Sequence, residues 1–249
     1  MSDLSISVFL MVTATFLVAG MVKGATGMGL PTVAMGVLGA LISPLAAASL
    51  LIMPSLVTNL WQLLSGPAFW PLIRRFWPMM LAICAGTMPG AAWLASGNSV
   101  ATTTGLGAAL AIYAGYTLLA RQLAVPARME PLLSPVIGGL TGMVSGATGV
   151  LVIPAVPYLQ ALALSRDDLV QALGLSFTVS TMALALALGA RGAFAMDAMG
   201  LSLLALIPAL AGMWAGQKLR HRISPATFRR VFLLFLLLLG AEMATRPLF

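Results

Sequence analysis

A short glycine-rich motif occurs twice in the chain, and its residue types suit the binding of an anion. Residues 20–27 read GMVKGATG and residues 142–149 read GMVSGATG, so seven of eight positions are identical at an offset of 122 residues. Glycines interrupt helices, and a helix that restarts after a break presents unpaired N–H groups and the positive end of its dipole. Such helix starts bind anions. The segments that begin at about Met28 and Val150 are therefore expected to present free amides.

Three side chains add chemistry to the two motifs. Thr26 and Thr148 place a hydroxyl at the same position of each copy. Lys23 is the only formal charge deep in an apolar segment, and burying an ammonium is costly unless a partner compensates it. Two interpretations stay open: Lys23 neutralises a bound anion, or it extends to the membrane surface. Ser145 at the matching position shows that the fold does not require the charge.

Further polar side chains lie in the third apolar segment of each half. They could hydrogen-bond a substrate, although hydrogen bonds between helices account for them equally well. The candidate substrate-binding residues are Lys23, Gly24, Thr26, Gly27, Met28, Gly29, Asn59, Gln62, Gly146, Thr148, Gly149, Val150, Ser176 and Thr178. Other glycines at four-residue spacing are interpreted as helix-packing positions, namely Gly20, Gly138, Gly142, Gly212 and Gly216.

The elements that position these residues are predicted to be membrane helices. The 249 residues are 60% hydrophobic and only 8% charged, whereas soluble domains carry roughly 25% charged residues. The mean hydropathy is +1.03, which indicates an all-α polytopic membrane protein. Apolar segments are expected at about 4–23, 28–42, 45–65, 76–96, 99–120, 133–149, 151–164, 169–190, 197–217 and 226–244. Segments 28–42 and 151–164 are shorter than the roughly 20 residues of a span and are expected to be half-helices.

The duplication divides the chain into two membrane repeats of about five segments each. The first repeat covers residues 1–120, a cytoplasmic linker covers 121–132, and the second repeat covers 133–249. If the first two segments of each repeat return to their starting side, ten of the 13 Lys and Arg residues fall on one side of the membrane. The positive-inside rule then predicts inverted repeats with both termini in the periplasm.

The position of the two motifs in the membrane stays open at this point. Each Gly-Ala-Thr-Gly either joins two spans at the membrane surface or forms the tip of a re-entrant hairpin. In both cases the helix is broken, and broken backbone is tolerated only inside protein or beside a wet cavity.

Several functions are disfavoured. Cys84 and His221 are each the only residue of their type, so no disulfide within the chain is expected. We also expect no metal site and no cofactor. No pair of carboxylates lies within an apolar segment, so the chain is not expected to be an enzyme. The excess of 13 basic over 6 acidic residues is spread over short loops and therefore indicates membrane orientation and not nucleic-acid binding.

The two motifs also carry a resemblance to a known family. The first copy continues as Gly-Ala-Thr-Gly-Met-Gly-Leu-Pro and the second as Gly-Ala-Thr-Gly-Val-Leu-Val-Ile-Pro. Within a duplicated hydrophobic plan, they resemble the TauE/SafE family of membrane permeases over essentially the whole chain. The positions carried over are residues 24–29 with Pro31 and residues 146–149 with Pro154. The second copy has Leu151 where the first has glycine, so the two half-sites are unequal.

The resemblance implies transport of small sulfur-containing anions, such as sulfite, sulfoacetate or other organosulfonates, across a bacterial inner membrane. We expect a secondary transporter, an exporter that works by alternating access. A passive anion channel and a permease for another small organic anion are the alternatives. The expected partners are the anionic substrate and the lipid bilayer, and the oligomeric state stays open, with a homodimer as one alternative.

Overall fold

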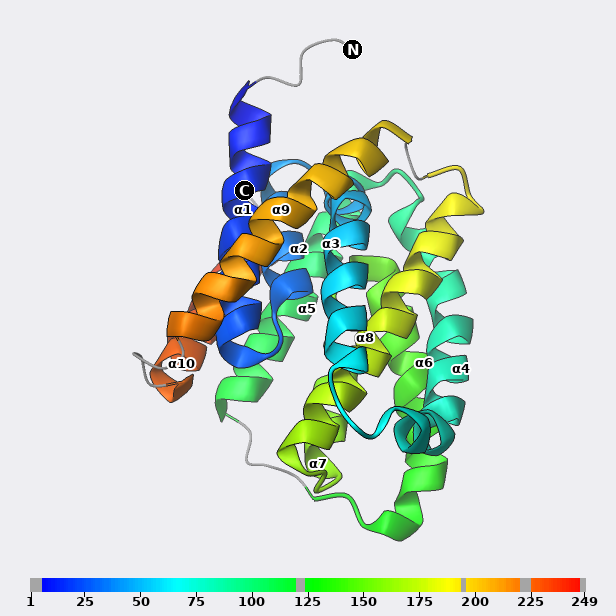
Figure 1. Cartoon of the computed structure of the whole chain (residues 1–249). Coiled ribbons are helices and arrows are strands. Elements are labelled where there is room, and N and C mark those ends of the chain that lie inside the picture. The colour runs from blue at the N-terminus through cyan, green and yellow to red at the C-terminus, as the bar shows by residue number, and fades with distance from the viewer. Residues whose placement is uncertain (1–5, 120–123, 194–195, 220–224, 247–249) are drawn as a thin grey trace.

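Helices make up the described fold. The computed structural model describes residues 6–119, 124–193, 196–219 and 225–246. This part of the chain contains ten α-helices, one short 3-10 helix and no strand (Figure 1), which confirms the all-α prediction. The helices are α1 (Ile6–Thr26), α2 (Leu30–Leu41), α3 (Pro44–Leu64), α4 (Phe69–Leu94), α5 (Ser99–Leu119), α6 (Glu130–Thr148), α7 (Ala155–Ala161), α8 (Arg166–Gly189), α9 (Met196–Leu219) and α10 (Pro225–Thr245), with the 3-10 helix at Ala127–Met129.

Four stretches of helix in the described residues are long and apolar enough to cross a membrane. They are α1, α3, α8 and Met199–Leu219 of α9. Each has at least 21 residues, which corresponds to about 31 Å of helix against a hydrocarbon core of about 30 Å. The chain is therefore a multi-pass membrane protein.

Each motif joins a long helix to a short one. α2 has 12 residues and α7 has 7, so their lengths of about 18 Å and 10 Å fall well short of a span. The two half-helices predicted from the sequence are therefore present. Most of α2 is buried in the protein. The preceding helices are longer, since α1 has 21 residues and α6 has 19.

The third helix of each half begins with the same kind of cap. The Ser43 hydroxyl accepts a hydrogen bond from the Ala46 amide at 3.2 Å, and the Ser165 hydroxyl accepts one from the Asp168 amide at 3.1 Å. A serine at this position satisfies one of the unpaired amides of the first turn. Ser43 and Ser165 are 122 residues apart, the same offset as the two motifs, and the two helix starts are thus built alike.

α4 differs from the prediction at its start. Its first helical residue is Phe69 and not a residue near 76, so Arg74 and Arg75 lie within the helix instead of in a loop. Pro71 is tolerated there because the first turn of a helix has no acceptor for its amide, and arginine is a good helix former. Arg75 pairs with Glu130 at the start of α6, with Nε 2.6 Å from Oε1.

Each half of the sequence packs its first helix against the fourth helix of the other half. α1 of the first half packs on α9 of the second, and α6 of the second half packs on α4 of the first. α3 contacts α9 as α8 contacts α4, and α3 and α8 also contact each other, as do α5 and α10. In Figure 1, α1 runs down from the upper end of the molecule and α6 runs up from the lower end.

Glycines let the helices of the α1–α9 and α4–α6 pairs approach each other closely. In the α1–α9 and α4–α6 pairs, a methyl group added at any of nine glycines would clash with a backbone carbonyl oxygen of the opposite helix. This confirms the packing interpretation for Gly20, Gly138, Gly142, Gly212 and Gly216. The equivalent contacts, with the glycine first, are Gly20–Ala209 and Gly142–Ile83, Gly24–Met213 and Gly146–Thr87, Gly212–Leu17 and Gly86–Gly139, and Gly216–Met21 and Gly90–Met143.

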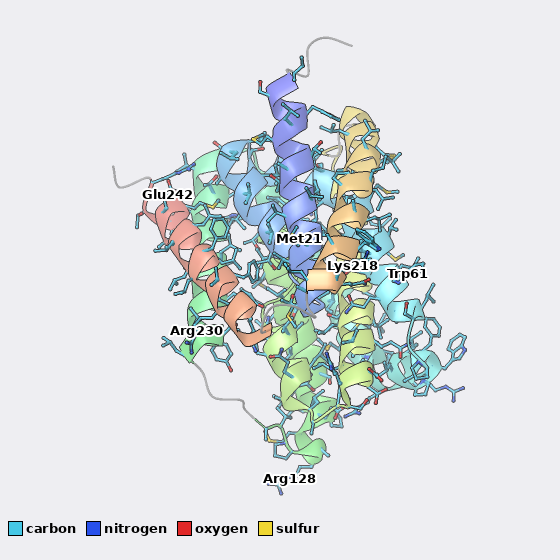
Figure 2. The ribbon with its side chains drawn as sticks, turned by 60° about the vertical axis from the view of Figure 1, so that its left-hand side comes forward. Met21, Trp61, Arg128, Lys218, Arg230 and Glu242 are labelled. Atoms are coloured by element: carbon cyan, nitrogen blue, oxygen red, sulfur yellow. The ribbon has the colours of Figure 1, made fainter. Side chains whose placement is uncertain are left out.

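The labelled charged residues lie at different heights in the molecule. Figure 2 shows Arg128 at the lower end and Glu242 in the upper part, with Arg230 between them. Of the basic residues used to predict the orientation, Arg121, Arg220 and Arg222 lie outside the described residues, as does His221.

Candidate functional site

The first motif opens onto a large cavity. The cavity has a volume of about 970 Å³, which is at the upper end of the range for small-molecule sites. Six helices (α1, α3, α5, α8, α9 and α10) and the loop after α1 contribute residues to its lining. Its lining residues are Lys23, Gly24, Ala25, Thr26, Gly27, Met28, Thr58, Trp61, Gln62, Ser65, Tyr113, Arg166, Val170, Met213, Gln217, Arg229, Phe232 and Leu233.

The loop after α1 depends on two glycines and one threonine. Gly27 and Gly29 have φ angles of 81° and 104°, a region that residues with a side chain rarely adopt. The Thr26 hydroxyl lies 2.9 Å from the Val22 carbonyl oxygen and 2.7 Å from that of Met28. The same hydroxyl accepts a hydrogen bond from the Met28 amide at 3.3 Å. The amide of Met28, expected to be free, is therefore already bonded.

The second motif has the same local geometry but does not line this cavity. Gly149 has a φ of 70°, the Thr148 hydroxyl donates to the Val144 carbonyl oxygen at 2.7 Å, and it accepts from the Val150 amide at 3.2 Å. The Val150 amide is therefore also bonded. Gly146 packs against α4, and Gly149 packs against Met35 of α2.

Lys23 is buried at the wall of the cavity. Its side chain lies in the last turn of α1 and is only 3% exposed. Nζ donates a hydrogen bond to Oδ1 of Asn59 on α3, and among the described residues no carboxylate pairs with it. Because lysine has three N–H donors, this neutral partner leaves capacity for an anion. The snorkelling interpretation does not fit this geometry, since Lys23 points to a buried amide.

The structure adds two cations that the candidate set lacks. Arg166 at the start of α8 and Arg229 near the start of α10 line the cavity and are exposed. None of the described aspartates and glutamates lines it. A guanidinium can bind two oxygens of an oxyanion in parallel. The only sequence signal for these residues is their place in the predicted cytoplasmic loops, which does not single out a site.

The other polar candidates are divided between the cavity and the core. Gln62 lines the cavity, with Nε2 donating to the Val170 carbonyl oxygen at 2.7 Å. Asn59 is fully buried behind Lys23. On α8, Thr178 donates to the Gly174 carbonyl oxygen at 2.7 Å, and Ser176 is buried with no hydrogen-bond partner among the described residues. Neither of these two lines the cavity.

Aromatic and polar side chains complete the cavity and were not among the candidates. Tyr113 of α5 is 5% exposed, with its hydroxyl 3.9 Å from the Met28 sulfur. Trp61 is largely exposed at the end of α3, and Gln217 extends from α9. Within the described ranges, no group of three or more His, Cys, Asp or Glu residues could hold a metal ion. The site can therefore attract a negative group electrostatically and contact an apolar portion of the same ligand.

Comparison with known proteins agrees with this geometry. No curated protein and no solved structure matches the chain. The family model described as sulfite exporter TauE/SafE matches residues 12–243, which include both motifs and every residue that lines the cavity. The chain belongs to the TauE/SafE family.

Proposed function

We propose that this protein is a secondary transporter that exports small sulfur-containing anions, such as sulfite, sulfoacetate or other organosulfonates. Its family is described as one of sulfite exporters. The observation that carries the proposal is the charge of the cavity, which is lined by Lys23, Arg166 and Arg229 and by no described carboxylate. A cavity of one sign attracts ligands of the opposite sign and rejects cations.

The proposed mode of binding follows from the position of each cation. Arg166 and Arg229 are exposed and attract the anion into the cavity, whereas Lys23 is buried and contacts it at the wall. The anion replaces the water that a charged Lys23 otherwise needs, and this compensation favours binding. Trp61 and Phe232 supply apolar surface for the organic part of a sulfonate.

Transport is proposed to follow alternating access between inverted repeats. The α1–α9 contact corresponds to the α6–α4 contact, and the glycine contacts of the two pairs are equivalent. Both observations support a two-fold relation between the halves. These contacts favour aligning Gly86 with Gly212 and Gly90 with Gly216. One motif faces an open cavity while its copy is closed, which is the asymmetry that one state of such a transporter requires.

The proposed location is the bacterial inner membrane, with both termini in the periplasm. Arg128, Arg166, Arg229 and Arg230 then lie on the cytoplasmic side, as the positive-inside rule requires. The cavity opens beside Arg166 and Arg229 and so faces the cytoplasm. An exporter would take up its substrate in this state.

Efflux from proteoliposomes loaded with radiolabelled sulfite or sulfoacetate tests the proposal. The protein should release both anions in a saturable manner and should not release choline, a cation of similar size. Lys23→Met should weaken anion binding by on the order of 1.5–3 kcal/mol, the range for hydrogen bonds to charged groups, and Lys23→Arg should retain part of the activity. Flux far above carrier rates would favour a passive channel. Release of other organic anions but of neither sulfur compound would favour a different permease.

A further inference from the structure

A continuous chain of buried hydrogen bonds begins at the Lys23 ammonium and crosses from the first half of the protein to the second. Lys23 donates to Oδ1 of Asn59, and Nδ2 of Asn59 donates to the Ser55 hydroxyl at 2.9 Å. Ser55 of α3 lies 3.0 Å from the hydroxyl of Thr181 on α8. Thr181 in turn donates to the Phe177 carbonyl oxygen at 2.7 Å.

The direction of each hydrogen bond in this chain is determined. A hydroxyl has one hydrogen to donate, and that of Thr181 is donated to Phe177. The Ser55 hydroxyl must therefore donate to Thr181 while it accepts from Asn59. Every link then has its donor on the Lys23 side and its acceptor on the far side, and hydrogen bonds aligned in this way polarise and strengthen one another.

These hydrogen bonds fix the orientation of the Asn59 amide. If the amide were reversed, its NH₂ group would face the ammonium and its oxygen would face a Ser55 hydroxyl that already donates to Thr181. Both contacts would be repulsive or unpaired, and unpaired polar groups are costly in a buried site. Asn59, Ser55 and Thr181 are each at most 2% exposed, so water does not replace a lost partner.

The side chains that continue these hydrogen bonds beyond Lys23 are also uncharged. Lys23 is held through a carbonyl oxygen and not through a carboxylate, so the positive charge is left for a ligand in the cavity. We propose that Asn59, Ser55 and Thr181 are positioning residues that hold the Lys23 ammonium, uncompensated, at the cavity wall for the transported anion. This inference rests on the proposed function. It assigns Asn59 a role behind Lys23 in place of the direct substrate contact expected from the sequence.

Asn59→Asp separates this role from a merely structural one. The substitution keeps the shape of the side chain but places a negative charge against Lys23, where it competes with the anion. The apparent KM for sulfite efflux should therefore rise at least about tenfold, as for the loss of a hydrogen bond to a charged group. A purely structural role predicts the opposite, because the new ion pair would preserve the contact and the KM.

Thr181→Val tests the end of the hydrogen-bond series that lies farthest from Lys23. It removes the acceptor of Ser55 without changing the volume of the side chain much, and the KM should rise about 3- to 10-fold, the effect of one neutral hydrogen bond, with a maximal rate within about twofold. Thr181→Ser should restore the KM. Thr15→Val is the matched control, because Thr15 is a buried threonine of α1 whose hydroxyl donates to the Met11 carbonyl oxygen within its own helix, at 2.8 Å, and has no other partner among the described residues.

Gel filtration and thermal unfolding would first establish that all variants are folded. An unchanged KM in Asn59→Asp, or a Thr181→Val variant that behaves like Thr15→Val, would overturn the positioning role while leaving the proposed transport function intact. Failure of the unmodified protein to transport either anion would overturn the proposed function and, with it, this inference.

Discussion

Gly27 and Gly149 occupy equivalent positions in the two motifs and share a left-handed backbone, yet their surroundings differ. A methyl group added at Gly27 would meet nothing within 4 Å, whereas one added at Gly149 would lie 2.7 Å from the Met35 side chain. The first motif therefore borders open space and the second is packed against α2. Local sequence cannot produce this difference, because the four residues Gly-Ala-Thr-Gly are the same in both copies.

Accessibility should follow this difference. In a Cys84→Ala background, Met28→Cys should react with a thiol reagent added on the cytoplasmic side, because Met28 lines the cavity. Val150→Cys at the matching position should not react from that side, because Val150 is fully buried. If the repeats exchange states during transport, Val150→Cys should react from the periplasm and Met28→Cys should become less reactive. Equal reactivity of both cysteines from one side would argue against alternating access.

The close approach of α4 and α6 predicts a position-specific loss of stability. Gly142→Ala would push a methyl group into the backbone carbonyl of Ile83, whereas Gly139→Ala, three residues earlier on α6, meets nothing within 4 Å. Overpacking typically costs about 1–3 kcal/mol, so the midpoint of thermal unfolding in detergent should fall for Gly142→Ala. Gly139→Ala should be neutral or stabilising, because alanine favours a helix more than glycine does. Equal midpoints would show that the helix contact is not tight.

The orientation of the chain can be tested by labelling from each side. Cysteines at Arg128 and at Arg220, which lies outside the described residues, should react only from the cytoplasm in a Cys84→Ala background. A cysteine at Ala193, after α8, should react only from the periplasm. The prediction follows from the distribution of positive charge between the loops. Labelling of Arg128→Cys and Ala193→Cys from the same side would contradict the inverted orientation.

The exposed and buried cations should respond differently to salt. Arg166→Gln and Arg229→Gln should raise the apparent KM several-fold at low ionic strength, and this effect should largely vanish near 1 M salt, where the screening length is about 3 Å. The effect of Lys23→Met should persist, because Lys23 is 3% exposed. Arg128→Gln is the control, since Arg128 is exposed but does not line the cavity. A similar effect of Arg128→Gln would indicate general surface charge instead of local attraction.

The membrane potential should drive export. An inside-negative potential favours the outward movement of an anion by about 2.3 kcal/mol per charge per 100 mV. None of the described Asp and Glu residues lines the cavity, so the carboxylate that usually binds a coupling sodium ion or proton is missing from it. Efflux from proteoliposomes should therefore accelerate when an inside-negative potassium diffusion potential is imposed. Strict dependence on a sodium gradient without a response to voltage would contradict this prediction.

The sequence by itself determined the helices and the duplication, because both are local. Ser43 and Ser165 cap their own helices, and the short apolar segments around Leu30 and Ala155 are limited in length by the glycines and prolines beside them. Lys23 could be singled out because a charge in an apolar segment is rare. Arg74 and Arg75 lie outside the predicted segment 76–96 but inside α4, because arginine near a helix end can reach the membrane surface.

Only the tertiary structure decided what Lys23 contacts and which motif is open. Asn59 is 36 residues away on another helix, and Arg229 reaches the cavity from the last helix of the chain. These contacts depend on how α1, α3, α8 and α10 pack, and no spacing along one helix encodes them. The identical Gly-Ala-Thr-Gly segments differ in exposure because one lies beside the cavity while the other packs against α2. Packing between helices sets that difference, since the local backbone of both motifs is the same.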